Sequence, residues 1–193
     1  MALVERVGAR YRPERRRHDR GGDAVMIARI PLWSEHPAAL PASDLWRARV
    51  WRLSSQHAER KARAVVRDAL TRAGASADTV ADMELVVAEL AANAVQHAKS
   101  PYELRIIFAG VDSRAVWCEV ADCDPSLGRI PELLNVAAVP EPDDDLDAVI
   151  ASLTVGGRGL ALVHGLTAGR CAVYPTTVCS PPRPGKAIGF ALL

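Results

Sequence analysis

The chain has little cysteine, and its cysteines lack the spacing of metal sites. Its 193 residues include 4 cysteines, and no two of them form a Cys-x-x-Cys pair. Zinc modules and secreted domains held by disulfides both need denser and more regular cysteine patterns. We therefore expect reduced cytosolic thiols at Cys118, Cys123, Cys171 and Cys179. Because Cys123 stands between two aspartates, its pKa should be raised.

Long apolar runs and a strong net charge are also missing. No apolar run reaches the ~18 residues of a membrane-spanning helix, and the N-terminal residues lack the apolar stretch of a signal peptide. The net charge is only +1, which argues against a surface devoted to nucleic acid, although arginines crowd the first twenty residues. The sequence predicts a cytoplasmic protein without direct contact with membrane or nucleic acid.

The length suits a single domain with one sizeable core. We expect residues 1–25 to be a disordered basic tail and residues 42–193 to form the domain, with a long lid at about 125–155. Apolar periodicity predicts strands at 45–53, 103–109, 115–121, 171–174 and 186–192, and helices at 56–73, 77–99 and 159–166. Ser54-Ser55 is the expected cap of the first helix. The predicted fold class is α/β, an α+β two-layer sandwich whose mixed, mostly antiparallel sheet carries helices on one face.

Polar side chains interrupt the apolar surface of the helix predicted at 77–99. Glu89, Asn93 and His97 recur every four residues, so they lie along one stripe of this helix. A carboxylate and an amide one turn apart can hold a hydrated divalent cation and orient a nucleophile. The alternative interpretation is an alanine-rich core helix with a few solvated polar residues.

The pattern Glu89-x-x-x-Asn93-Ala-x-x-His97 resembles the N-box of the GHKL ATPases, which include gyrase, histidine kinases and MutL-type proteins. In that superfamily the asparagine coordinates the Mg²⁺ that bridges the nucleotide phosphates. The glutamate acts as a general base or orients the attacking group. The resemblance implies these roles for Asn93 and Glu89, with ATP and Mg²⁺ as cofactors and the GHKL ATPase fold.

Two further segments follow in the order that the superfamily requires. Asp122 ends a predicted strand, as does the aspartate of the family's Asp-x-Gly box, which accepts a hydrogen bond from the exocyclic amine of adenine. In this chain Asp124 stands where that box has glycine. The second segment, Gly156-Gly157-Arg158-Gly159-Leu160, leads into a helix, whose free amides favour phosphate. It resembles the second glycine box of the small bacterial anti-sigma-factor kinases.

Gly185-Lys186 is the other glycine and lysine pair with a resemblance to a phosphate loop. It lacks the upstream glycine and the following Ser or Thr of a Walker loop. We expect a turn into a final strand there, with Lys186 as a solvated turn residue.

The three motifs together resemble bacterial anti-sigma factors that are also serine kinases, over about residues 46–193. The resemblance implies a protein that binds a sigma factor and phosphorylates a serine on its antagonist. Glu89 would be catalytic, and the nucleotide and metal would be bound by Asn93, Asp122, Gly157, Arg158, Gly159 and Leu160. Whether a homodimer forms is left open.

Two alternatives remain at this point. An ATP-binding regulatory module without transferase activity fits the glycine missing at position 124, but such a module does not need a base at Glu89. A histidine kinase fragment would need an upstream pair of dimerisation helices with a phospho-acceptor histidine. His57 lies instead on a helix of the same domain.

Overall fold

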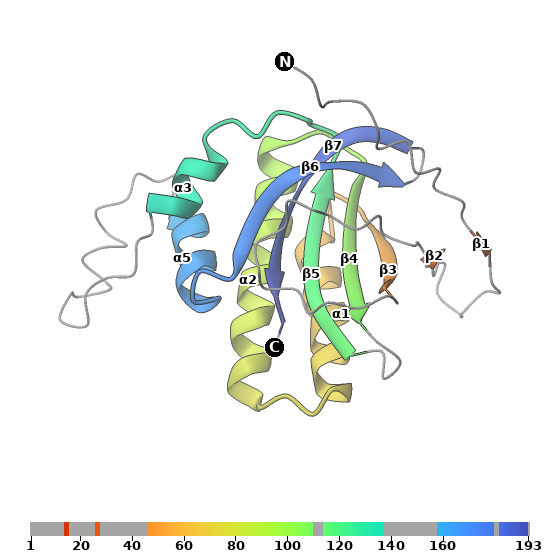
Figure 1. The fold of residues 1–193 in the computed structure, drawn as a ribbon, viewed down its shortest axis with the longest axis vertical. Helices are drawn as coiled ribbons and strands as arrows, with labels where there is room; N and C mark the ends of the chain where they lie inside the picture. Colours follow the sequence, from red (N-terminus) through yellow and green to blue (C-terminus); the bar gives the residue numbers. More distant parts are fainter. Residues whose placement is uncertain are drawn as a thin grey trace, which may run out of the picture.

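A five-stranded sheet forms one layer of the fold (Figure 1). The structure, a computed structural model, describes residues 14–15, 26–27, 46–109, 114–136, 158–179 and 182–192. The strand order is β3-β4-β5-β7-β6, and every neighbouring pair is antiparallel. The strands are β3 (Trp46–Leu53), β4 (Tyr102–Ala109), β5 (Arg114–Asp122), β6 (Cys171–Cys179) and β7 (Pro182–Ala191).

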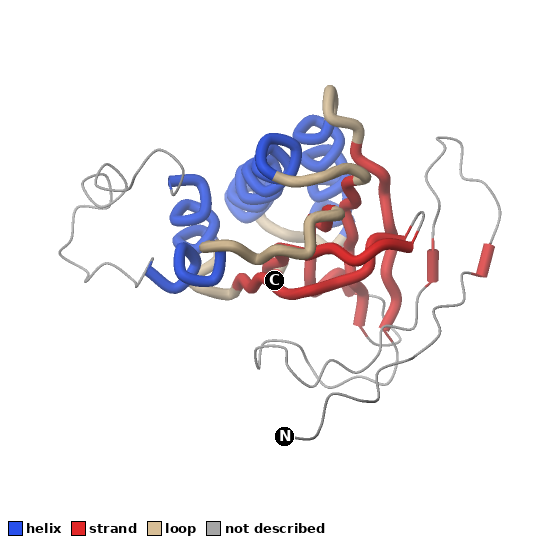
Figure 2. The backbone as a smooth tube through the Cα atoms, turned by 90° about the horizontal axis from the view of Figure 1, so that it is seen from above, coloured by secondary structure: helices blue, strands red, loops and turns tan. Residues whose placement is uncertain are grey.

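The helices form the second layer, and Figure 2 shows them on one face of the sheet. They are α1 (Ala58–Arg72), α2 (Ala77–His97), α3 (Ile130–Val136) and α5 (Arg158–Leu166). The predicted α+β sandwich with helices on one face is therefore confirmed, and its five-stranded sheet is antiparallel throughout. Within the predicted lid, the structure describes the short helix α3, which the sequence pattern did not indicate.

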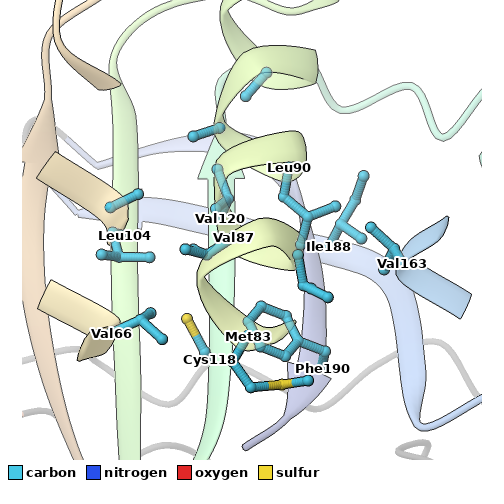
Figure 3. Packing of buried hydrophobic residues seen from close by; sticks show 14 of the residues in the cluster. Val66, Met83, Val87, Leu90, Leu104, Cys118, Val120, Val163, Ile188 and Phe190 are labelled. Atoms are coloured by element: carbon cyan, nitrogen blue, oxygen red, sulfur yellow. The ribbon is translucent and has the colours of Figure 1, made fainter. Parts of the chain in front are cut away.

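The core lies between the two layers (Figure 3). Helix α2 presents Val87 and Leu90 to the sheet, while Leu104 and Phe190 project toward them from β4 and β7, all at most 1% exposed. Alternate residues of a strand share one face, so Tyr102, Leu104 and Ile106 of β4, and Ile188 and Phe190 of β7, enter this core. Burial of these apolar surfaces fixes α2 across the sheet and thereby fixes its polar stripe.

The two long helices differ in how their N-termini are capped. Ser76 caps α2, because its hydroxyl accepts a hydrogen bond from the amide of Thr79 at 3.1 Å. Helix α1 begins after His57, which forms no side-chain cap. The prediction that Ser54-Ser55 caps α1 is therefore wrong, because one further turn separates these serines from the helix.

The second face of the sheet is covered in part by the outer half of the β6–β7 hairpin, which bends across β5 and β4 (Figure 1). Arg105 of β4 donates hydrogen bonds to the Thr176 hydroxyl at 3.1 Å and the Thr177 carbonyl at 2.7 Å. In the sheet order, β5 and β7 separate β4 from β6. These contacts therefore need the hairpin to fold over the sheet, which brings residues of β6 and β7 close to the end of β5.

The predicted N-terminal tail falls mostly outside the described residues. Two short strands, β1 (Glu14–Arg15) and β2 (Met26–Ile27), pair with each other in an antiparallel two-stranded sheet. The disordered tail at 1–25 and most of the lid at 125–155 stay predictions.

Candidate functional site

The polar stripe of α2 brings a carboxylate and an amide together. The Nδ2 of Asn93 donates to Oε1 of Glu89 at 3.5 Å, the long end of the hydrogen-bond range, and both side chains are half-buried. This arrangement turns the amide nitrogen of Asn93 toward Glu89, so its Oδ1 is the atom suited to a hard cation such as Mg²⁺. His97 is exposed at the last turn of α2.

The start of α5 lies against Glu89. A Cβ atom added at Gly159 would lie 1.9 Å from Oε1 of Glu89, far inside van der Waals contact. A side chain at position 159 would therefore require the Glu89 carboxylate to move away from its present place at the start of α5. The first amides of α5 have no partner within the helix and attract negative charge.

The other residues of the glycine-rich segment differ in what they offer. Arg158 is exposed at the first position of α5, whereas the side chain of Leu160 is 6% exposed and packs into the core. Any contribution of Leu160 to nucleotide binding must therefore come from its backbone. Gly156 and Gly157 lie outside the described residues, so the predicted phosphate contact of Gly157 stays a prediction.

Asp122 is buried at the end of β5, with 3% of its surface exposed. Its Oδ1 accepts two hydrogen bonds, from the amide of Asp124 at 2.8 Å and from Nζ of Lys186 at 3.0 Å. Burial raises the pKa of Asp122, while the Asp124 amide and the Lys186 ammonium oppose this effect. The carboxylate predicted to select adenine is therefore held by two donors.

The structure corrects the expectation for Lys186. Its side chain is 6% exposed, and it forms an ion pair with Asp122. The prediction of a solvated turn residue is wrong, because β7 begins earlier than expected, at Pro182, and pairs Lys186 directly with Asp122. One sequence signal was present: Lys186 has the same parity as the buried Ile188 and Phe190, which face the core.

Further contacts connect the three parts of the site. The amide of Cys123 donates to the carbonyl of Lys99 at 2.9 Å, which ties the turn after Asp122 to the C-terminal end of α2. Because α5 also packs on α2 and meets Glu89, the chain's three motifs gather around one helix. The pKa of Cys123 is raised as predicted, mainly through burial, with a smaller contribution from Asp122.

A comparison with family models decides what this arrangement represents. The model of the histidine kinase-like ATPase domain matches residues 53–170, more than half of the chain. The chain belongs to this family. Membership supports ATP binding by the GHKL-type domain and agrees with the order of its three motifs. The match covers α1 through α5 and ends before β6 and β7, so it does not include Lys186. No curated protein matches the chain.

Other potential sites in the described part of the chain are less informative. A surface hollow of about 530 Å³ at the start of α1 is lined by residues of 55–67 and contains no residue of the nucleotide site. The described ranges hold no group of three or more His, Cys, Asp or Glu residues suited to a metal. Among the same residues, no helix has both the length and the apolar character to cross a membrane.

Proposed function

We propose that this protein is an ATP-dependent serine kinase of the anti-sigma-factor type, which binds a sigma factor and phosphorylates a serine on the antagonist of that complex. The observation that carries the proposal is the contact of Glu89 with both Asn93 and the start of α5. A protein that only binds nucleotide needs the asparagine and the glycines, but it does not need a half-buried carboxylate beside them.

The donor set fits ATP with Mg²⁺. Asn93 offers an amide oxygen as a metal ligand, and Mg²⁺ commonly takes one or two protein ligands together with phosphate oxygens. The amides at the start of α5 suit phosphate, and exposed Arg158 adds a positive charge there. Asp122 would accept a hydrogen bond from the adenine amine, and Glu89 would accept the proton of the seryl hydroxyl. Phosphoryl transfer depends mainly on positioning and electrostatic stabilisation, so these few groups suffice.

The competing function is a regulatory module that binds ATP without transferring phosphate. Its support was the carboxylate at position 124, where the family's box has glycine. Nζ of Lys186 lies 3.2 Å from the Asp124 carbonyl and 3.9 Å from its Oδ2. This ammonium offsets part of the added negative charge, which supports a functional adenine site despite the missing glycine.

Substitution of Glu89 and Asn93 tests the proposal. Glu89→Gln keeps the shape but cannot accept a proton, so we expect ATP binding to persist while transfer falls roughly 10²–10⁴-fold. Asn93→Ala should weaken ATP binding in the presence of Mg²⁺, because the metal loses a protein ligand. Calorimetric titration with ATP and transfer of label from radioactive ATP to candidate antagonists measure the two effects. Transfer at the wild-type rate by Glu89→Gln would exclude Glu89 as the base. Absence of transfer by a wild type that binds ATP would favour the regulatory module.

A further inference from the structure

Lys186 is a buried cation beside Asp122, the carboxylate proposed to select adenine. Neither the motifs nor the family match assigns Lys186 a role. Its Nζ donates to Oδ1 of Asp122 at 3.0 Å and to the carbonyl of Asp124 at 3.2 Å. Few lysines are buried to this degree unless they are paired. The ammonium therefore bridges the last residue of β5 and the turn that follows it.

The backbone holds Lys186 in this place. Residue 186 is the cross-strand partner of Asp122 in the β5–β7 pair. The preceding Gly185 packs so closely that a Cβ atom there would lie 1.8 Å from the carbonyl oxygen of Asp122. Close approach of the two strands therefore fixes the backbone of residue 186 beside Asp122.

The two oxygens of Asp122 differ in their surroundings. The Lys186 ammonium and the Asp124 amide both donate to Oδ1. Among the residues that the structure describes, no donor reaches Oδ2, and no fully buried side-chain oxygen or nitrogen lacks a partner. Oδ2 must therefore retain some contact with solvent. The result is a carboxylate with one fixed oxygen and one oxygen available to a ligand.

We propose that Lys186 is the positioning residue for adenine selection. By occupying Oδ1 of Asp122, it presents Oδ2 to the exocyclic amine of adenine. This proposal rests on the proposed ATP binding. Lys186 lies outside residues 53–170, which match the family model. Burial favours the protonated form of Asp122, whose pKa it raises, and Lys186 opposes that change. A protonated Oδ2 would donate a hydrogen bond and would no longer select an amine. Within the described part of the chain, the carboxylate of Asp124 and the thiol of Cys123 are further titratable groups that interact with Asp122.

A comparison of two nucleotides tests this role. ATP and purine riboside triphosphate differ only in the 6-amino group that Oδ2 would bind. For the wild type with Mg²⁺, we expect calorimetry to give a Kd for ATP roughly 10-fold to 100-fold lower than that for the analogue, since the amine bonds to a charged acceptor. In Lys186→Met this ratio should fall to about threefold or less, because ATP loses affinity and the analogue does not. A purely structural role would weaken both nucleotides alike.

Two controls complete the experiment. Lys99→Met removes an exposed lysine that follows the C-terminal end of α2, near the same turn, and should leave the ratio unchanged. If Lys186→Met does not fold, Lys186→Gln keeps a neutral donor in a similar volume but lacks the charge that opposes protonation of Asp122, so its ratio should also fall below that of the wild type. A ratio that stays at the wild-type value in the folded variant overturns the role of Lys186 alone. A higher ratio would mean that Lys186 competes with adenine, and it overturns the proposal as well. A wild type that binds neither nucleotide overturns the proposed ATP binding together with this inference.

Discussion

The two faces of the sheet are buried by different chemistry. On the helical face, α1, α2 and α5 pack apolar side chains such as Val87 and Leu90 against the strands (Figure 3). On the other face, Arg105 bonds to two carboxylates, Glu103 at 2.8 Å and Glu119 at 2.9 Å. The first face is stabilised by removal of apolar surface from water, which tolerates small shifts. The second combines small apolar clusters, such as the one of Ala121, Val178 and Ala187, with charges that must remain paired, so loss of one charged partner should be costly there.

The largest expected effect is loss of the cation on the polar face. Arg105→Ala leaves Glu103 and Glu119, which are 0% and 1% exposed, without their shared partner. We expect the free energy of unfolding to fall by about 3–5 kcal/mol, the usual cost when one member of a buried ion pair is removed. Urea denaturation measures it, with Arg63→Ala on the exposed side of α1 as a control that should change it by less than about 0.5 kcal/mol. Equal effects of the two variants would mean that the buried charges are not coupled to folding.

A large effect is also expected from the apolar face. Leu90 is 1% exposed, and Leu90→Ala should cost about 2–5 kcal/mol through lost burial and a residual cavity. Leu85 provides the matched control, because it lies on the same helix but is 43% exposed. Leu85→Ala should change stability by less than about 0.5 kcal/mol. A small fall in the free energy of unfolding for Leu90→Ala would mean that the helices and sheet move together and fill the cavity.

The sequence predicted the helical face and its polar stripe well, because the relevant spacing is local. Glu89 and Asn93 are four residues apart on one helix, so their proximity follows from the helical repeat alone. The partners on the other face and at the adenine site are far apart in sequence: 64 residues separate Lys186 from Asp122, and 71 separate Arg105 from Thr176. Only strand register and the bend of the β6–β7 hairpin bring them together. An alternating strand also gives the same pattern whether its polar side faces water or a buried network.

A smaller loss is expected from one hydroxyl of the polar face. The Tyr174 hydroxyl donates to Glu119 and accepts from Nε1 of Trp117 at 3.0 Å. Tyr174→Phe removes both contacts and should cost about 1–3 kcal/mol, because Glu119 and Trp117 each lose a hydrogen bond in a buried place. Tyr102→Phe is the control on the helical face, where the hydroxyl donates a single long bond of 3.4 Å to the Ala98 carbonyl. Tyr102→Phe should lower the free energy of unfolding by less than about 1 kcal/mol. A larger fall for Tyr102→Phe than for Tyr174→Phe would contradict the expected difference between the two faces.

The smallest effect concerns alkaline pH and tests whether the polar face remains closed to water. Burial, followed by the neighbouring charge of Glu119, raises the pKa of Tyr174 well above its ordinary value of about 10. Above the ordinary pKa of about 10, the unfolded chain loses the phenolic proton while the folded chain keeps it. Folding stability therefore declines as the pH rises toward the folded pKa. Burial also raises the pKa of Cys118, so its contribution to the unfolding free energy falls with pH in the same way. Because wild type and Tyr174→Phe both contain Cys118, this contribution cancels in their difference. The difference in unfolding free energy between wild type and Tyr174→Phe should therefore narrow between pH ~8 and ~11. A constant difference would mean that Tyr174 ionises as easily in the folded state as in the unfolded one, and that water reaches the network.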